Sequence, residues 1–215
     1  MKTYKTQQED FWAGDFGNEY IERNRDEKTI VTSNTALFAK ILSRTPDIQS
    51  VIEFGANIGL NLRAIRNLRP EVQMSAIEIN QKAIKELQQI KDLQIYNMSI
   101  LDFSPDQQRD FVFTKTVLIH INPEKLAKVY DLLYQTSRRY ICLVEYYNPT
   151  PVSVLYRGHE NRLFKRDFAG ELLDRYPQLR LIDYGFVYHR DTFPQDDVNW
   201  FLLEKPVGDE ANRRI

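Results

Sequence analysis

The segment from Ser50 to Leu62, SVIEFGANIGLNL, constrains the fold of this chain more than any other feature. A short apolar run ends at Glu53, a turn with two glycines follows at residues 55–59, and a helix-compatible stretch comes next. A strand, a tight glycine turn and a helix start place backbone N–H groups where they can approach a nucleotide-like ligand. The segment therefore predicts the first strand–turn–helix unit of a parallel sheet.

Strands and helices alternate after this unit. The helices are expected at 32–45 (from Thr32 or Ser33 to just before Pro46), 59–69, 80–90 (opened by Asn80), 123–137 and 165–175, and the strands at 50–54, 72–78, 93–97, 110–114, 140–146, 179–187 and 198–204. Only a short link joins the last two strands. This pattern predicts an α/β fold with a mostly parallel seven-stranded sheet, helices on both faces and an antiparallel C-terminal hairpin.

Composition excludes several classes of protein. The 215 residues suit one domain with a sizeable core, and the net charge of −1 argues against a broad basic surface for nucleic acid. The sequence has no apolar run of about 18 residues and no secretory signal at its start, so we expect a soluble cytoplasmic protein without a membrane span. Cysteine and histidine are too few and too scattered for a zinc site, so no metal is expected. Cys142 lies in an apolar run and is expected to be buried.

A second acid, Glu78, ends the next apolar run about 20 residues after the glycine turn, the spacing of a carboxylate that binds ribose hydroxyls. The turn and this acid together predict an adenosine-containing cofactor at the carboxyl edge of the sheet. A nicotinamide dinucleotide is disfavoured because Asn57 replaces the middle glycine and the C-terminal half is a hairpin rather than another β-α-β pair. Asn tolerates left-handed backbone angles, so the turn remains feasible.

The run EFGANIG at 53–59 resembles the acid-and-glycine signature of class I S-adenosylmethionine-dependent methyltransferases. Three longer stretches are similar to the methylases associated with pseudaminic acid biosynthesis: QQEDFWAGDFGNEYIERN at 7–24, TKTVLIHINPEKL at 114–126 and VEYYNPTPVSVLYRGHENRLFKRDFAGELLDRYP at 144–177. The resemblance implies a Rossmann-like class I methyltransferase fold and S-adenosylmethionine as cofactor, with S-adenosylhomocysteine as product. It also implies a pathway of acidic nine-carbon sugars.

The resemblance and the residue chemistry together predict a cofactor site. Its expected members are Trp12, Tyr20, Asn24, Glu53, Gly55, Ala56, Asn57, Gly59, Glu78, Ile79, Ser99, Ile100, Asp102 and Thr114. Gly55 and Gly59 would leave room for the methionine half and the ribose, and Glu53 would orient the turn or meet the amino group. Asp102 would hold the adenine amino group, beside Ser99 and Ile100, and Thr114 would lie at the methionine end. Read singly, Glu78 could be a solvated strand end and Asp102 a turn cap.

Residues 1–30 form a candidate lid over a methyltransferase domain at 31–215. Trp12, Phe16 and Tyr20 recur every four residues, which would line one helix face. Trp12, Tyr20 and Asn24 could cover a sulfonium, which aromatic faces attract, and closure would exclude water. The alternative is an ordinary amphipathic helix packed on the sheet.

The irregular segment 147–166 follows the fifth strand and is expected to be a substrate-binding insertion. Its basic side chains are Arg157, His159, Arg162, Lys165 and Arg166. Arg suits a carboxylate or phosphate, so the segment predicts a small anionic substrate such as a sugar acid or nucleotide sugar. Tyr147 would wall a sugar ring and Asn148 would bond a hydroxyl. A solvated basic loop is the alternative.

Methyl transfer to an alcohol or amine needs alignment and a base. The candidate catalytic residues are His120 after the fourth strand, then His189 and Tyr146, and His159 is a further candidate base. The predicted function is methylation of oxygen or nitrogen on a small anionic metabolite, with a nonulosonic sugar acid as one such acceptor. An amino-acid-derived acceptor and a non-catalytic S-adenosylmethionine-binding module are the alternatives. The sequence leaves the acceptor atom and the oligomeric state open.

Overall fold

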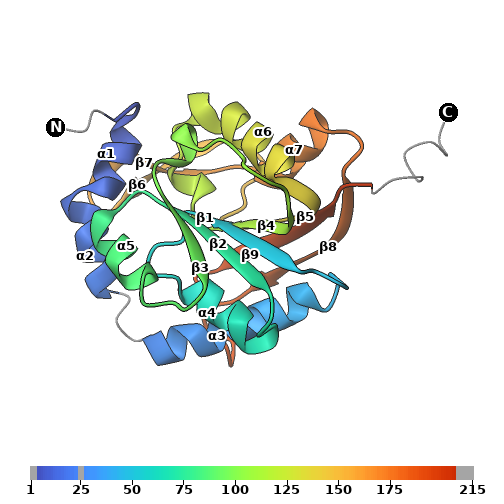
Figure 1. Cartoon of the computed structure of the whole chain (residues 1–215). Coiled ribbons are helices and arrows are strands. Elements are labelled where there is room, and N and C mark those ends of the chain that lie inside the picture. Colours follow the sequence, from blue (N-terminus) through green and yellow to red (C-terminus); the bar gives the residue numbers. More distant parts are fainter. Residues whose placement is uncertain (1–3, 24–26, 207–215) are drawn as a thin grey trace.

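A seven-stranded sheet forms the centre of the molecule (Figure 1). The computed structural model describes residues 4–23 and 27–206. The sheet has the order β3-β2-β1-β4-β5-β9-β8, with β1 (Ser50–Phe54), β2 (Gln73–Glu78), β3 (Leu93–Asn97), β4 (Arg109–Lys115), β5 (Ser137–Glu145), β8 (Arg180–Val187) and β9 (Val198–Glu204). β1 to β5 are parallel, and β9 and β8 join as an antiparallel pair. The predicted architecture is confirmed, and each strand lies within three residues of its expected bounds.

Helices cover both faces of the sheet (Figure 1). On one face lie α3 (Glu27–Leu42), α4 (Leu60–Leu68) and α5 (Gln81–Leu87), and on the other lie α6 (Leu126–Thr136) and α7 (Phe168–Arg175). Successive strand residues point to opposite faces, so Val51 and Phe111 enter one core while Ile52 and Val112 enter the other. Cover on both faces explains why these strands read as continuous apolar runs.

The strand order reverses between β1 and β4, which creates a crevice at the carboxyl ends of the strands. Three short 3-10 helices lie in the loops there: η1 (Ile100–Asp102) after β3, η2 (Leu118–His120) after β4 and η3 (Pro123–Lys125) before α6. The Asn80 side chain opens α5 as predicted, because its Oδ1 accepts hydrogen bonds from the N–H groups of Lys82 (2.8 Å) and Ala83 (3.0 Å). The loops at this edge therefore start from rigid elements.

The N-terminal aromatic residues lie on two helices instead of one. α1 (Gln7–Ala13) and α2 (Asp15–Arg23) meet at Gly14, and Figure 1 shows them together at one side of the molecule. The Trp12 ring still meets Phe16 and Tyr20 edge to face, with centroids 5.5 and 5.3 Å apart. The backbones cross so closely that a Cβ at Gly17 would lie 1.9 Å from the Trp12 carbonyl oxygen. The helices thus form a tight aromatic pair.

Helix α3 shows that the expected helix start at Thr32 or Ser33 was wrong. The helix begins at Glu27, and the Thr32 hydroxyl donates to the Lys28 carbonyl (2.8 Å) inside it. Thr35 does the same to Val31 (2.7 Å). A threonine hydroxyl inside a helix can donate to the carbonyl four residues earlier, so a threonine does not always mark the start of a helix.

The segment expected to be irregular at 147–164 contains a hairpin. β6 (Val152–Tyr156) and β7 (His159–Lys165) form a separate two-stranded antiparallel sheet. Arg157 and Gly158 both have positive φ (48° and 84°), as a two-residue turn between strands requires. Proline residues just before β6 suggested a loop, whereas the Arg-Gly pair was the hairpin signal that the sequence reading missed.

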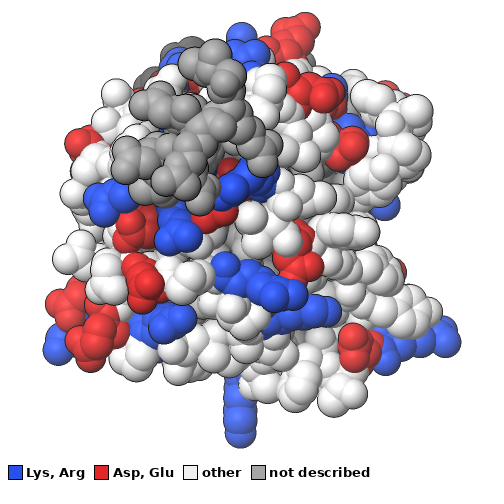
Figure 2. Space-filling view, turned by 90° about the vertical axis from the view of Figure 1, so that its right-hand side faces the viewer, with Lys and Arg blue, Asp and Glu red and all other residues white. Residues whose placement is uncertain are grey.

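The β8 edge of the sheet faces the viewer in Figure 2. Lys and Arg are interspersed there with Asp and Glu, and uncharged surface separates them. Tyr184 and Phe186 of β8 are more than half exposed. Among the described residues, no helix is long and apolar enough to cross a membrane.

Candidate functional site

A cavity of about 190 Å³ lies at the carboxyl ends of β1 to β4, and α1 and α2 contribute to its wall. The expected site residues that line it are Trp12, Tyr20, Gly55, Ala56, Asn57, Glu78, Ile79, Ser99, Ile100 and His120. They come from four loops and the N-terminal helices. The fold thus gathers most of the predicted cofactor set and the first candidate base.

The glycine turn forms the floor of this site. The N–H groups of Gly55 and Ala56 donate to the Ile77 carbonyl, at 2.9 and 3.0 Å. Gly55 has φ of 78°, and a Cβ there would lie 2.7 Å from Cγ2 of Val117. Asn57 has φ of 47°, so the expectation that Asn adopts the left-handed angle is confirmed. Gly59 lies outside the lining. A Cβ at Gly59 would lie 2.5 Å from Cδ1 of Ile90 and 2.8 Å from Cδ2 of Leu87, so the glycine makes room for side chains of α5 and the loop after it.

The carboxylate of Glu78 joins the turn to the start of α5. It accepts hydrogen bonds from the N–H groups of Asn57 (2.7 Å), Ile79 (2.8 Å) and Asn80 (2.7 Å). Burial raises the pKa of Glu78, and these three bonds oppose that shift. A carboxylate offers about four acceptor positions, so the group keeps capacity for a further donor.

Glu53 is buried and only half satisfied. Its Oε1 accepts from Asn61 Nδ2 at 2.6 Å, whereas Glu53 Oε2 and Asn61 Oδ1 have no hydrogen-bond partner among the described residues. Burial raises the pKa of Glu53 to about 8, and the nearby Lys115 moderates the rise. Asn61 lines the cavity while Glu53 lies behind it. Glu53 Oε2 and Asn61 Oδ1 are thus two buried polar atoms without a partner among the described residues.

Lys115 is the one Lys or Arg among the described residues that line the cavity. Burial lowers its pKa, and the negative charges of Glu53, Asp196 and Glu145 oppose this. The preceding residue, Thr114, was the one expected from the sequence to lie at the methionine end. Thr114 lies outside the lining and donates to Glu145 at 2.9 Å, because alternate residues of a strand point to opposite sides.

His120 lies in η2, and its ring contacts those of Trp12 and Tyr156, at centroid distances of 4.5 and 5.0 Å. Its Nδ1 is 2.6 Å from the carbonyl oxygen of Arg162 in β7. A carbonyl can only accept, so Nδ1 carries the proton and Nε2 keeps a free lone pair. Burial lowers the pKa of His120 to about 4, although the bond to the carbonyl opposes this. The imidazole is therefore neutral near pH 7.

Helix α1 is attached to the loop after β3. Ser99 Oγ donates to Glu9, whose other carboxylate oxygen accepts from the Thr6 N–H at 2.7 Å. The sequence reading missed Glu9, although the spacing T-x-x-E at 6–9 is a capping-box signal. Asp102 lies outside the cavity lining and pairs with Lys5, while the expected Ser99 and Ile100 line the cavity.

The expected substrate residues do not line this cavity. Arg157 stacks on Tyr156 at the hairpin tip, His159 packs on Phe11 and Phe16, Arg162 lies over Phe11, Lys165 lies over Tyr146, Tyr147 is exposed, and Asn148 donates to the Thr150 carbonyl. Tyr147 and Asn148 precede the hairpin, Arg157 lies in its turn, and only His159, Arg162 and Lys165 lie on β7.

Two expected catalytic residues also lie outside the cavity lining. His189 is on the exposed loop between β8 and β9, with Nδ1 2.9 Å from Asp197. Tyr146 is half-buried beneath Lys165, and burial raises its pKa. Asn24 falls outside the described residues.

Comparison with known proteins establishes the fold. The sequence matches no protein-family model and no curated protein. Among solved structures, a similar one is the Burkholderia thailandensis 1,6-didemethyltoxoflavin-N1-methyltransferase with bound 1,6-didemethyltoxoflavin and S-adenosylhomocysteine (TM-score 0.68, 14% identity, covering 95% of this chain and 93% of that chain). The plantazolicin methyltransferase BpumL in complex with S-adenosylhomocysteine gives a TM-score of 0.65 at 13% identity, with 93% and 94% covered.

The magnesium protoporphyrin IX methyltransferase of Synechocystis PCC 6803, with bound S-adenosylmethionine, covers 95% of this chain and 100% of its own at 12% identity and a TM-score of 0.62. Identities this low carry information on the fold alone. The chain thus has the Rossmann-like fold of class I methyltransferases, as predicted.

Proposed function

We propose that this protein is an S-adenosylmethionine-dependent methyltransferase that acts on oxygen or nitrogen of a small molecule. The observation that carries the proposal is the pair of unpaired buried acceptors, Glu53 Oε2 and Asn61 Oδ1, beside the glycine turn. When bound, S-adenosylmethionine supplies an electrophilic methyl group on a positively charged sulfur. Its ammonium group would donate to these two oxygens, with Glu53 ionised in the complex, and no dinucleotide half is needed at this site.

The remaining cavity residues suit the rest of that ligand. Glu78 would accept from the ribose hydroxyls with its spare capacity, and Ser99 and Ile100 would lie beside the adenine. The rings of Trp12 and Tyr20 would lie near the sulfonium, where aromatic faces stabilise positive charge. Gly59, Thr114 and Asp102 lie outside the lining and, unlike Glu53, carry no unpaired buried polar atom, so we assign no direct contact to them.

We propose residues 1–30 as a cover of this site and 31–215 as the methyltransferase domain. Polar contacts attach the described part of the cover: Asn80 Nδ2 donates to the Trp12 carbonyl (3.1 Å), and Gln8 Nε2 donates to the Asn161 carbonyl (3.0 Å) of the β6–β7 hairpin. A cover attached by a few polar contacts can open to admit ligands and close to exclude water.

His120 is the proposed general base. Its Nε2 would take the proton from the hydroxyl or amine of the acceptor as the methyl group is transferred. The low pKa keeps this nitrogen deprotonated, and the Arg162 carbonyl fixes the ring. His189, with its Asp197 partner, is the second candidate, although it is exposed and outside the cavity lining.

For the acceptor we propose a small anionic metabolite. Lys115 supports this, because it is the one Lys or Arg among the described residues that line the cavity. The sequence resemblance extends the proposal to a nonulosonic sugar acid or a nucleotide sugar. An amino-acid-derived acceptor remains the alternative with the same donor.

Two measurements test this function. Calorimetry with S-adenosylhomocysteine should detect binding to the wild-type protein, and absence of heat contradicts the proposal. Incubation with S-adenosylmethionine and a panel of anionic metabolites should then yield a product heavier by one methyl group. Binding without turnover on acidic sugars, nucleotide sugars and amino-acid derivatives alike favours the non-catalytic module. The Glu204→Gln variant is a control, since Glu204 pairs with Arg139 and Arg180 outside the cavity lining.

The proton position on His120 has a direct spectroscopic test. With only three histidines in the chain, 15N-histidine NMR can resolve each ring, and His120→Ala assigns the signal. We expect His120 to be protonated on Nδ1 at pH 8 and to stay neutral, without an imidazolium signal, down to pH 5, because its pKa is lowered to about 4. A ring that titrates near its ordinary pKa would remove it as the buried base.

A further inference from the structure

The segment from Lys115 to His120, here called the strap, leads from the end of β4 through η2 along the cavity. Lys115, Thr116, Val117 and His120 all line the cavity. Val117 also packs directly on the glycine turn, at the position that a Cβ on Gly55 would occupy. The strap therefore carries both the proposed base and a wall of the proposed cofactor site.

One side chain holds the backbone of the strap. Glu145, the last residue of β5, is buried and receives three successive backbone N–H groups: Val117 at 3.1 Å and Leu118 at 3.0 Å on Oε1, and Ile119 at 3.4 Å on Oε2. Thr114 Oγ1 adds a fourth donor at 2.9 Å on Oε1. These N–H groups open η2, where no backbone acceptor is available to them. The carboxylate thus acts as the cap of the helix that bears His120.

The carboxylate and the strap depend on each other energetically. Burying a carboxylate is unfavourable unless donors surround it, and burying three N–H groups is unfavourable unless an acceptor meets them. Burial raises the pKa of Glu145 to about 7, while its four donors oppose the rise. The titratable groups around it are Lys115 on the strap, Tyr146 after β5 and Tyr130 on α6. A proton on Glu145 would convert one acceptor oxygen into a hydroxyl.

We propose that Glu145 is a positioning residue that holds the strap so that Nε2 of His120 is presented to the cavity. This rests on the proposed function, and it extends that function to a residue with no contact of its own with the cavity. The arrangement couples two anchors on one ring, since β7 holds Nδ1 through the Arg162 carbonyl and β5 holds the backbone through Glu145. Loss of the carboxylate, by substitution or by protonation, releases the backbone anchor.

The test compares Glu145→Gln with wild type in the full chain. Gln keeps the size of the side chain but offers one acceptor oxygen in place of two. We expect faster amide exchange across 116–121 and a His120 15N spectrum that changes from one Nδ1-protonated tautomer to a mixture. Binding of S-adenosylhomocysteine should weaken less than roughly tenfold, a change below about 1.4 kcal/mol. In wild type the same spectral change should appear on acidification through pH 7, and it should be absent in Glu145→Gln.

Matched variants separate positioning from general stability. Glu204→Gln removes another buried strand-end carboxylate and should leave the His120 spectrum unchanged. Thr114→Val removes a single hydrogen-bond donor to Glu145, and it should change the ratio of released to held strap by roughly fivefold. Thr114→Ser keeps that donor and should behave as wild type. If Glu145→Gln does not fold, the Thr114 pair decides. A wild-type His120 spectrum in folded Glu145→Gln or Thr114→Val overturns the proposal. Absence of S-adenosylhomocysteine binding to wild type with these spectral changes present contradicts the cofactor assignment alone.

Discussion

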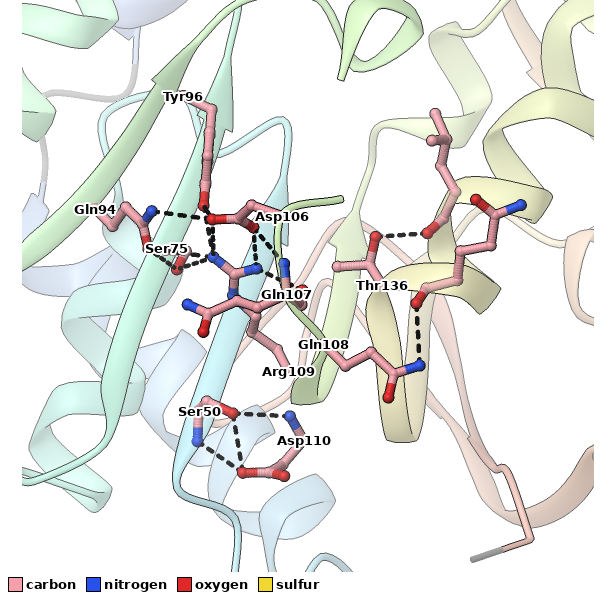
Figure 3. Close-up of polar contacts among 12 residues, drawn as sticks. Ser50, Ser75, Gln94, Tyr96, Asp106, Gln107, Gln108, Arg109, Asp110 and Thr136 are labelled. Atoms are coloured by element: carbon pink, nitrogen blue, oxygen red, sulfur yellow. Dashed lines mark hydrogen bonds and ion pairs between the residues drawn. The ribbon is translucent and has the colours of Figure 1, made fainter. Parts of the chain in front are cut away.

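Two buried ionisable side chains lie at opposite ends of neighbouring strands, and their surroundings differ. Arg109 begins β4 and is 1% exposed, while Glu53 lies near the end of β1 and is fully buried. The partners of Arg109, shown in Figure 3, are Asp106 (2.5 Å), the Gln107 carbonyl (2.6 Å), Tyr96 Oη (2.6 Å), Gln94 Oε1 (3.1 Å) and Ser75 Oγ (3.4 Å). Glu53 has Asn61 as its one hydrogen-bond partner among the described residues.

The difference separates a buried charge that the chain pairs fully from one that it pairs only in part. A buried charge is tolerated when its own chain supplies enough partners, as the chain does around Arg109. Where partners are missing, a buried charge lowers stability unless it is neutralised or paired with a ligand. The raised pKa of Glu53 reflects this, because burial favours the neutral carboxyl group. The two ends of the sheet should therefore respond to substitution in opposite ways.

The largest effect on stability is expected at Arg109, whose side chain is fully hydrogen-bonded. Arg109→Met should lower the free energy of unfolding by about 3 kcal/mol, because it leaves Tyr96, Gln94 and the part-exposed Asp106 without their shared partner. Chemical denaturation measures the loss, and binding of S-adenosylhomocysteine by the folded fraction should stay unchanged. Arg138→Met is the control, since this arginine is 60% exposed and its ion pair with Asp110 should contribute below about 1 kcal/mol. Equal losses in the two variants would contradict the comparison.

At Glu53 we expect substitution to raise stability instead of lowering it. Its pKa rises from 4.5 to about 8 on folding, so the folded state keeps a proton that the unfolded state has lost. Stability therefore declines as the pH rises through that window, and Glu53→Gln should remove the decline. The variant should be more stable by about 1–3 kcal/mol at pH 7, and it should bind S-adenosylhomocysteine at least about tenfold more weakly. Denaturation from pH 5 to 8 with matched calorimetry checks both, and destabilisation with intact binding would reverse the assignment.

The sequence predicted the sheet well because its signals are local. The apolar runs, the glycine turn and the Asn80 cap each depend on neighbouring residues, and the structure has them where expected. Several residues of such units do line the cavity, as Asn57 in the turn and Ser99 after β3 do, although Gly59 of the same turn does not.

The rest of the site depends on contacts between distant segments. The contact of Glu9 with Ser99 spans 90 residues, and the bond from His120 to Arg162 spans 42. Successive residues of a strand point to opposite sides, so Lys115 lines the cavity and Thr114 does not. An error of one residue in the sequence prediction therefore selects the wrong side of the strand. The basic run in 147–166 suggested one patch, but pairing into β6 and β7 leaves Arg157 in the turn and puts Arg162 and Lys165 over different aromatic rings.

A smaller effect is expected at the start of α1. Thr6→Ala removes the hydroxyl that accepts from the Glu9 N–H, and loss of such a cap typically lowers stability by about 1 kcal/mol. We expect faster amide exchange in α1 and weaker S-adenosylhomocysteine binding, because Thr6 and Glu9 both line the cavity. Asp167→Ala removes the equivalent cap of α7, outside the cavity lining, and should cost similar stability without changing affinity. Equal effects on affinity would show that α1 has no special part in the site.

The smallest effect is expected at Asn57, where the backbone alone contacts Glu78. Asn57→Gly keeps the N–H that donates to Glu78 and suits φ of 47°, so stability and S-adenosylhomocysteine affinity should change by less than about 0.5 kcal/mol. Asn57→Ala keeps the same N–H but disfavours the left-handed angle, and it should cost about 1 kcal/mol. Calorimetry and denaturation of the two variants separate backbone from side chain. A large loss of affinity in Asn57→Gly would mean that the Asn57 amide itself contacts the ligand, and that the turn is more than a backbone cradle.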